Sequence, residues 1–157
     1  SRYDERIFLA INKHFDGGRV DRTQFEGGRD FIAFRLADTY LMLAEAQFFS
    51  GATADAATSY NVIRKRAAWP GKESAMLITA SDLNVNFVMD EREREMLGEQ
   101  SRWFDLARWG NLIERVKLHN PQAAGSIKAH HILRPIPQIQ IDRAEGTSSS
   151  FPQNPGY

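Results

Sequence analysis

Apolar residues recur at helical spacing in two neighbouring segments, and this pattern constrains the fold more than any other feature of the chain. Steps of three and four residues place side chains on one face of a helix. In residues 30–49 such a face is formed by Phe34, Ala37, Leu41, Ala44 and Phe48. Asp30 is the predicted N-cap of this helix, and Gly51 follows where a helix commonly ends.

A second stripe predicts a partner for this helix. In residues 54–67 it comprises Ala56, Tyr60, Ile63 and Ala67. A connection of about four residues makes the two helices antiparallel. The small side chains of Ala44 and Ala56 allow a close approach of the two backbones. The segment 30–67 is therefore predicted to be a helical hairpin.

Further helices are expected downstream. The sequence Trp69-Pro70-Gly71 breaks the second helix, and a loop of about ten residues follows. Ser81 and Asp82 are predicted to cap a third helix that extends to about residue 100. A fourth is expected over residues 102–116, with Asn120-Pro121 beyond its end. Its stripe consists of Leu106, Trp109, Ile113 and Val116.

Both ends of the chain are predicted to be irregular. Residues 1–29 read as a loop-rich lead-in in which residues 7–11 form a short strand or a buried segment, and two Gly-Gly pairs mark turns. The tail, residues 130–157, contains four prolines, which exclude a long helix and a central strand. We expect an extended segment there with a polar turn at residues 146–150. The fold class is thus mostly α, built from helical hairpins with an irregular Pro-rich tail.

Composition excludes several classes of function. A chain of 157 residues with 42% hydrophobic residues is large enough to bury about two thirds of its unfolded surface. Twenty basic and twenty acidic side chains give a net charge of zero, which argues against a dedicated nucleic-acid binder. The absence of cysteine excludes thiol catalysis and Cys-ligated metals. No apolar run approaches the about 20 residues of a membrane span.

The densest charge run, residues 90–95, raises the question of catalysis. Glu91 and Glu95 lie one helical turn apart, and a carboxylate pair is what a glycoside hydrolase uses. Arginines are interleaved with these carboxylates, however, and would hold them in ion pairs. Charge runs of this kind are usually networks on a helix face. The structural interpretation is favoured, and we predict no catalytic residues.

Other chemistry-bearing residues give weaker signals. The four histidines show no metal-ligand spacing, so neither a metal site nor a cofactor is predicted. Ser148 to Ser150 lack the context of a catalytic nucleophile. Trp103 and Trp109 follow helical spacing and are expected in the core. Trp69, beside Pro70 in a loop, is the tryptophan we expect to be displayed, and an exposed aromatic face suits the apolar face of a sugar ring.

Three motif blocks, taken together, resemble the SusD/RagB family of outer-membrane nutrient-binding lipoproteins. The first covers residues 35–46 (RLADTYLMLAEA), Gly51, Ala56-Ala57 and residues 61–67. The second covers residues 90–96, 98–99, 102–106 and 108–110. The third is residues 133–137 (LRPIP) with the terminal residues 153–157 (QNPGY). The blocks occur in order and span residues 30–157.

The resemblance implies that this chain is the C-terminal part of a longer protein. Family members are several times longer and carry a lipobox cysteine and a helical-repeat half that this sequence lacks. The hairpin at residues 30–67 is similar to a tetratricopeptide repeat through Tyr40, Leu43, Ala44, Ala56 and Tyr60. Gln47 and Ile63 depart from that pattern, which usually has an aromatic and a small residue there.

The function implied by the resemblance is binding. Family members are lipoproteins on the surface of the Gram-negative outer membrane, where they cover a SusC-like TonB-dependent transporter and capture glycans or, in some members, peptides. Their known glycan contacts lie mainly upstream of the matched region, so no contact residue is carried over to this chain. We therefore expect a glycan or peptide ligand, a SusC-like partner and attachment through an N-terminal lipid anchor.

The motif residues look like determinants of the fold. They are expected to form a buried network of ion pairs and hydrogen bonds, made by Arg64, Glu91, Arg92, Arg102 and Asp105. Removing one partner of a buried pair costs about 3–5 kcal/mol. The substitution Arg102→Ala is therefore expected to unfold the domain.

Two other functions remain open at this point. A glycoside hydrolase would turn over an oligosaccharide and lose that activity on Glu91→Gln with its fold intact. A free-standing tetratricopeptide-type adaptor would bind a peptide in a groove, which requires more repeats than one hairpin.

Overall fold

The computed structural model describes residues 11–19, 21, 23, 27–30, 32–146 and 150–157. These residues form helices and connecting segments, with no β-strand among them, so the mostly α prediction is confirmed. The chain divides into two compact units, residues 1–99 and residues 100–157. The strand or buried segment predicted at residues 7–11 and most of the turn predicted at residues 146–150 lie outside the described residues, and Ile11 itself is exposed.

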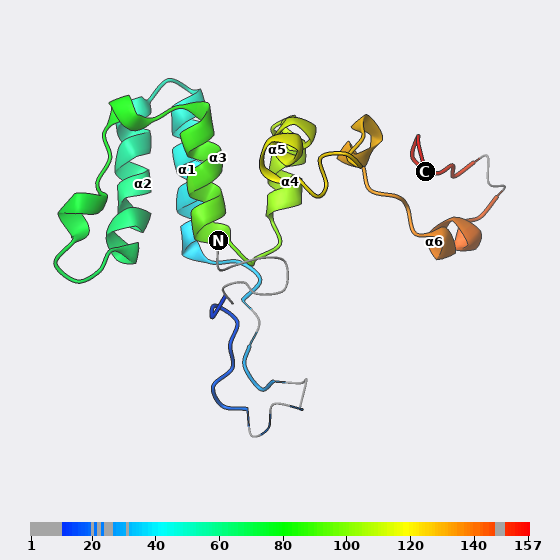
Figure 1. Cartoon of the computed structure of the whole chain (residues 1–157), viewed down its shortest axis with the longest axis horizontal. Helices are drawn as coiled ribbons and strands as arrows, with labels where there is room; N and C mark the ends of the chain where they lie inside the picture. The colour runs from blue at the N-terminus through cyan, green and yellow to red at the C-terminus, as the bar shows by residue number, and fades with distance from the viewer. Residues whose placement is uncertain (1–10, 20, 22, 24–26, 31, 147–149) are drawn as a thin grey trace. The chain divides into compact units, whose positions relative to one another are not determined.

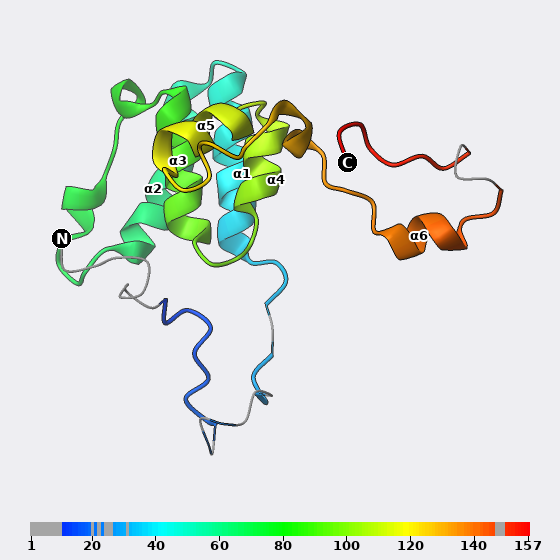
Figure 2. The same cartoon turned by 45° about the vertical axis from the view of Figure 1, so that its right-hand side comes forward.

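Three α-helices stand side by side in the first unit (Figure 1). They are α1 (Leu36–Phe49), α2 (Thr53–Ala67) and α3 (Val85–Met96), and two short 3₁₀ helices, η1 (Glu73–Met76) and η2 (Ala80–Asp82), connect α2 to α3. Figure 2 shows the same arrangement from a second direction. The antiparallel hairpin of α1 and α2 is confirmed. Its buried apolar residues are Leu41, Ala44, Ala56, Ala57, Tyr60 and Ile63, joined by Val88 and Met89 of α3.

Gly51 ends α1 as predicted. Its φ of +88° is a left-handed conformation that glycine adopts without steric cost. The amide of Gly51 donates to the Phe48 carbonyl (3.1 Å), and that of Ala52 donates to the Gln47 carbonyl (2.9 Å). Carbonyls of the last turn, which have no partner within the helix, are thereby satisfied.

The start of α1 was predicted too early. The helix begins at Leu36, its N-cap is Arg35 rather than Asp30, and Phe34 precedes it with 87% of its surface exposed. The physical reason lies in Arg35, whose backbone is extended and whose side chain donates to Glu95 of α3 and to Glu99 just beyond it. A similar shift occurs in α3, where Asn84 is the cap and accepts from the Phe87 amide (3.0 Å).

Asp82, predicted to cap α3, has another role. Its carboxylate accepts from the amide (2.8 Å) and from the hydroxyl (2.8 Å) of Thr79, which closes the short turn of η2. These hydrogen bonds lower the pKa of Asp82 below its usual value. Because the Asp82 carboxylate is hydrogen-bonded to Thr79 in η2, Asn84 is the residue that caps α3. Helix α3 also ends at Met96, earlier than the predicted residue 100, and Gly98 follows with a φ of +83°.

The second unit contains two helices where one was predicted. They are α4 (Arg102–Arg108) and α5 (Leu112–His119). Gly110, at φ +74°, lies between them, and the Asn111 amide donates to the Leu106 carbonyl (2.9 Å). A left-handed glycine ends a helix in this way. The apolar stripe continues past this break, and for that reason the periodicity alone predicted a single helix. The predicted end at Asn120-Pro121 is confirmed.

Among bends, turns and extended segments, the described part of the tail contains one 3₁₀ turn and one short helix. These are η3 (Ala129–Ile132) and α6 (Gln138–Arg143), which the sequence analysis did not predict. Pro137 directly precedes α6, and proline suits the start of a helix because its φ is already helical. Gln138 Nε2 donates to Asp142 Oδ1 across one turn (2.8 Å).

The two halves of the third motif block contact each other. The C-terminal residues turn back along the tail (Figure 2), and their side chains hydrogen-bond the backbone of residues 133–136. Asn154 Nδ2 donates to the Arg134 carbonyl (2.7 Å), and the Tyr157 hydroxyl donates to the Leu133 carbonyl (2.7 Å). The Arg134 guanidinium in turn lies over the ring of Phe104, at 4.7 Å from its centroid.

Candidate functional site

A cluster of charged side chains gathers where α3 ends. We call it the Arg35 cluster; it comprises Lys13, Arg35, Arg66, Glu95 and Glu99. Arg35 Nε donates to both carboxylate oxygens of Glu99 (2.9 Å each), and Nη1 donates to Glu95 Oε1. Its Nη2 donates to the Glu95 carbonyl (2.7 Å). One guanidinium therefore holds two carboxylates four residues apart in the sequence, in the fork geometry that arginine provides.

Two further cations complete the Arg35 cluster. Lys13 Nζ donates to Glu99 Oε1 (2.7 Å) and to the Glu95 carbonyl (2.8 Å). Arg66 Nη2, from the last turn of α2, donates to Glu95 Oε1. The hydrogen bonds from Arg35, aided by Lys13 and opposed by partial burial, lower the pKa of Glu99 to about 2. Glu99 is consequently ionised at neutral pH, and the pKa of Arg35 is raised.

A second group of ion pairs involves three of the predicted network residues. Arg64 Nη1 donates to Glu91 Oε2 (2.7 Å), and Arg94 donates to the same oxygen from Nε (2.9 Å) and Nη2 (2.7 Å). Arg92 Nη1 donates to Asp38 Oδ1 of α1 (2.7 Å). The ion pair of Arg64 with Glu91 thus joins α2 to α3, and the ion pair of Arg92 with Asp38 joins α3 to α1.

The other two predicted network residues, Arg102 and Asp105, belong to the second unit. Asp105 is buried, and its Oδ1 lies 3.7 Å from Arg108 Nη2. Arg102 begins α4 and makes polar contacts of its own. The predicted network residues are therefore divided between the two units. The contribution of these residues to stability stays a prediction.

Sequence reasoning missed Asp38 and most of the Arg35 cluster. The signal was present for Glu95 and Glu99, whose spacing of four residues places them on one helix face. Arg35 stood in the first motif block, but nothing in a single sequence shows which distant carboxylates an arginine will reach. The contacts of Arg35 span 60 and 64 residues.

A pocket of about 780 Å³ adjoins the Arg35 cluster. Residues of the lead-in form one wall, and the ends of α2 and α3 form the other. Its basic lining residues are Lys13, Arg19, Arg29, Arg35, Arg66 and Arg94. Its carboxylates are Asp16, Asp30, Glu95 and Glu99. The sequence analysis did not predict this pocket, because half of the lining comes from a segment without periodicity.

Trp69, the predicted ligand candidate, is displayed as expected. It is 82% exposed and occupies the first position of a turn in which the Lys72 amide donates to the Trp69 carbonyl (2.8 Å). Pro70 and Gly71 fill the central positions, and Gly71 has a φ of +78°. Pro followed by a left-handed Gly is the pattern of a type II turn. The turn fixes the backbone from which the indole projects; binding by Trp69 stays a prediction.

Within the described part of the chain, no three His, Asp or Glu side chains are grouped so that they could hold a metal ion. His130 and His131 instead contact the ring of Tyr157, at centroid distances of 4.9 Å and 6.1 Å. None of the helices in the described residues has the length and hydropathy needed to cross a bilayer.

Comparison with known proteins gives a family. The model of the SusD family matches residues 5–157. Two similar proteins come from Formosa agariphila: SusD-like protein P25 is 31% identical over 85% of this chain, and SusD-like protein P2 is 28% identical over all of it. A third, SusD-like protein P38 of the same organism, is 32% identical over 54% of the chain. No solved structure matches the chain significantly.

The matched region is a fraction of each relative. The chain spans 26% of the length of SusD-like protein P25 and 33% of that of SusD-like protein P2. The family model, in contrast, covers nearly the whole chain and includes all three motif blocks. The expected resemblance is therefore confirmed, and the chain belongs to the SusD family.

Proposed function

We propose that the protein binds a glycan at the surface of the outer membrane without cleaving it, and delivers it to a SusC-like TonB-dependent transporter. Membership of the SusD family is the observation that carries this proposal. The protein would be held at the membrane by an N-terminal lipid anchor, and closure over the transporter would be biased by the ligand through its higher affinity for the closed state.

The display of Trp69 supports glycan recognition by this part of the protein. An indole ring that is largely exposed on a fixed turn offers a flat apolar surface to the C–H face of a sugar ring. Little backbone conformational entropy is lost on binding, because the turn already fixes the backbone that carries the indole. Binding sites for sugars combine such surfaces with a few polar groups, and the Arg35 cluster supplies polar groups within the same unit.

The geometry of Glu91 and Glu95 disfavours the hydrolase alternative. The side chain of Glu91 is 6% exposed, and its Oε2 accepts hydrogen bonds from Arg64 and Arg94. Glu95 Oε1 is likewise occupied by Arg35 and Arg66. A catalytic carboxyl group must reach the glycosidic oxygen or the anomeric carbon. These two are directed into ion pairs instead.

A peptide-binding adaptor is a second alternative. Peptide grooves in tetratricopeptide proteins are built from several stacked repeats, whereas the described residues contain one such hairpin, α1 with α2. This favours a role for the hairpin as part of a larger array. Peptides remain an alternative ligand class, and the binding experiment includes them.

Calorimetric titration against matched oligosaccharides and peptides tests the proposal. The expected result is saturable binding of at least one oligosaccharide, with no new reducing ends after prolonged incubation. Release of shortened products would indicate a hydrolase. Binding of peptides alone would support the adaptor. A failure to bind any oligosaccharide would contradict the proposed ligand class.

A further inference from the structure

The pocket beside the Arg35 cluster has an excess of positive charge that the chain as a whole lacks. Six basic side chains line it against four carboxylates, while the complete sequence has equal numbers of both. Its volume of about 780 Å³ lies within the range of about 300–1,000 Å³ that is typical of small-molecule sites. A local excess of cations in a concave site attracts anions.

Two of the pocket carboxylates, Glu95 of α3 and Glu99 just beyond its end, are already engaged. Glu99 accepts hydrogen bonds from Arg35 and Lys13, and Glu95 accepts from Arg35 and Arg66. Arg35 is fully committed to this arrangement, since its Nε and both Nη atoms donate within it. Arg35 and Lys13 therefore build the floor of the pocket, and the outer cations are the groups that face an incoming ligand.

Arg66 and Arg94 are those outer cations. Their side chains are 58% and 55% exposed. A guanidinium has five N–H donors. The contacts described for Arg66 use Nη2, and the hydrogen bonds described for Arg94 use Nε and Nη2. On both side chains Nη1 takes part in none of these hydrogen bonds, and the planar guanidinium suits a carboxylate or a sulfate group.

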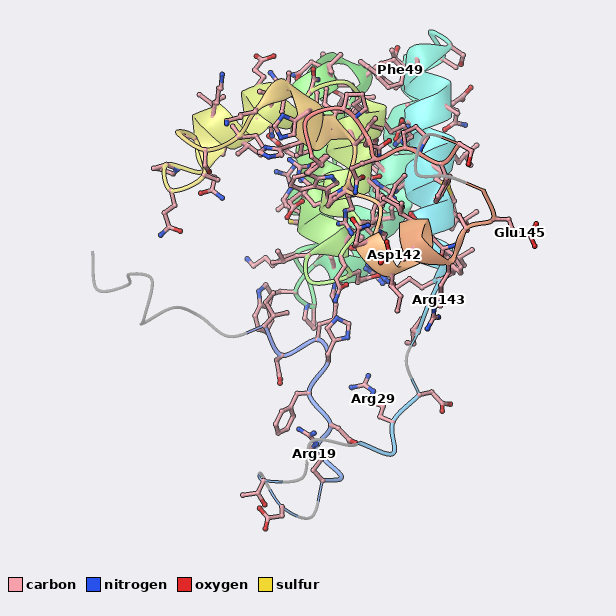
Figure 3. The ribbon with its side chains drawn as sticks, turned by 90° about the vertical axis from the view of Figure 1, so that its right-hand side faces the viewer. Arg19, Arg29, Phe49, Asp142, Arg143 and Glu145 are labelled. Atoms are coloured by element: carbon pink, nitrogen blue, oxygen red, sulfur yellow. The ribbon has the colours of Figure 1, made fainter. Side chains whose placement is uncertain are left out.

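The lead-in brings two more arginines to the pocket wall. Arg29 Nη1 donates to the Phe15 carbonyl (3.0 Å), and this hydrogen bond joins the two limbs of the lead-in. Figure 3 shows Arg29 reaching from its own limb toward the opposite one, on which Arg19 lies. These two arginines share the wall with Asp16 and Asp30, so cations reach the pocket from both sides, and the excess of positive charge comes from the whole lining.

Trp69 lies close to this pocket in the chain. It follows Arg66 by three residues, so their Cα atoms are at most about 11 Å apart, although Trp69 itself is not in the pocket lining. A short oligosaccharide spans such a distance. The exposed indole and the exposed guanidinium thus offer a stacking surface for one sugar ring and hydrogen-bond donors for an acidic substituent on the same chain of sugars.

From this arrangement we infer that the ligand is an acidic glycan, whose carboxylate or sulfate groups are bound by Arg66 and Arg94 in the pocket while a sugar ring stacks on Trp69. The inference rests on the proposed function, because it names the chemical class of the glycan. Carboxylate and sulfate present similar oxygen acceptors to a guanidinium, so both sources of the anion are included in the test.

Calorimetry with three oligosaccharides of equal length provides the test: one neutral, one bearing uronic acids and one bearing sulfate esters. An acidic oligosaccharide is expected to bind at least tenfold more tightly than the neutral one, and added salt should weaken that binding. Equal affinity for the neutral compound would overturn the inference and leave the proposed function intact. Absence of binding by all three would contradict both.

Variants of the pocket arginines separate recognition from folding. Arg66→Gln is expected to weaken binding of the acidic oligosaccharide about tenfold and to leave that of the neutral one unchanged. Arg66→Lys, which keeps the charge, should lose less. Arg143→Gln in α6, an exposed arginine that is not a pocket-lining residue, is the matched control. If Arg66→Gln lowers the melting temperature, Arg94→Gln and Arg29→Gln replace it.

Inorganic sulfate distinguishes a glycan site from a simple anion site. It is titrated alone and as a competitor against the acidic oligosaccharide. Weak binding of the free ion, with partial competition, is expected because the ion cannot reach the indole. Affinity for sulfate equal to that for the oligosaccharide would overturn the inference, since the sugar would then contribute nothing. Unchanged affinity for the acidic oligosaccharide in all three arginine variants would overturn it as well.

Discussion

Gln153 hydrogen-bonds both polar groups of the Ile136 backbone. Its Oε1 accepts from the Ile136 amide (2.7 Å), and its Nε2 donates to the Ile136 carbonyl (2.8 Å). A single side-chain amide thereby takes the place of a neighbouring strand beside a segment that has none. Because Pro135 and Pro137 flank Ile136, its amide is the one donor in this short stretch, and Gln153 uses it.

Gln153→Ala is expected to release the C-terminal residues from the tail. Two hydrogen bonds are lost, and at about 1 kcal/mol each the local free energy of opening should fall by about 1–3 kcal/mol. Amide hydrogen exchange at Ile136 measures this opening directly, and protection should drop by one or more orders of magnitude. Gln140→Ala, an exposed glutamine of α6, serves as the control. Equal protection at Ile136 in both variants would contradict the assigned role.

The sequence predicted this contact only in part. Both partners were identified as motif residues, at 133–137 and 153–157, but the pairing was not, because a hydrogen bond between irregular segments leaves no periodicity. The hairpin of α1 and α2 was predicted well since its apolar stripes and Gly51 agree. The division at Gly110 was missed because the stripe runs through it, and the N-cap at Arg35 because a tertiary ion pair overrode the local signal of Asp30.

In the candidate site, too, the local features could be predicted from the sequence and the long-range contacts could not. Trp69 was predicted from a strictly local signal, the sequence Trp-Pro-Gly, and the structure displays it on a turn. The pocket depends on pairings between residues more than 60 positions apart, such as Arg35 with Glu99. Long-range ion pairs depend on how the elements come together, and neither charge count nor spacing specifies them. The sequence shows which residues are charged, whereas the fold decides which of them meet.

Gly110→Ala tests the break between α4 and α5. At φ +74° an alanine is strained by roughly 1–2 kcal/mol, although an added Cβ would meet no atom within 4 Å. The variant should therefore unfold at lower urea concentration, with no change in packing. Gly125→Ala is the matched control, because its Cβ also meets open space and its φ lies outside the left-handed region. Equal midpoints for the two variants would show that the backbone conformation at Gly110 is not a constraint.

Glu91→Gln tests the buried ion pair with Arg64. The carboxylate is 6% exposed and that guanidinium 17%, so loss of the negative charge leaves a largely buried cation without its counter-charge. A destabilisation of roughly 3–5 kcal/mol is expected in chemical denaturation. Asp55→Asn in α2 removes an exposed carboxylate of the same unit and should cost less than about 1 kcal/mol. A Glu91→Gln effect no larger than this control would refute a structural role for the pair.

The lowered pKa of Glu99 makes the stability of the fold depend on pH. Hydrogen bonds from Arg35, and then from Lys13, lower its folded-state pKa from the usual 4.5 to about 2. A depressed pKa means that the folded state favours the ionised form. Its contribution to stability is therefore fully present above about pH 4.5 and is lost as the pH falls toward about 2.

Unfolding of the parent chain and of Glu99→Gln across pH 2 to 7 measures this contribution. The parent chain should be the more stable of the two near neutral pH, and the difference between them should shrink below about pH 4.5 and approach its minimum near pH 2. A difference that stays constant over the whole range would show that the charge of Glu99 plays no part in its contacts with Arg35 and Lys13.

Trp69→Ala tests glycan stacking at the displayed turn. The side chain is 82% exposed, so its removal should change the free energy of unfolding by less than about 0.5 kcal/mol. Loss of an aromatic stacking surface is expected to weaken binding of the preferred oligosaccharide by tenfold or more in calorimetric titration. Trp69→Phe, which keeps a smaller aromatic face, should bind with intermediate affinity.

Phe34→Ala is the control for this last experiment, because Phe34 is also highly exposed but lies before α1, outside the turn that displays Trp69, and neither side chain is in the pocket lining. Its affinity for the oligosaccharide should equal that of the parent chain. If Trp69→Ala and Phe34→Ala bind alike, the indole takes no part in recognition, and the exposure of Trp69 has to be explained by something other than a sugar ring.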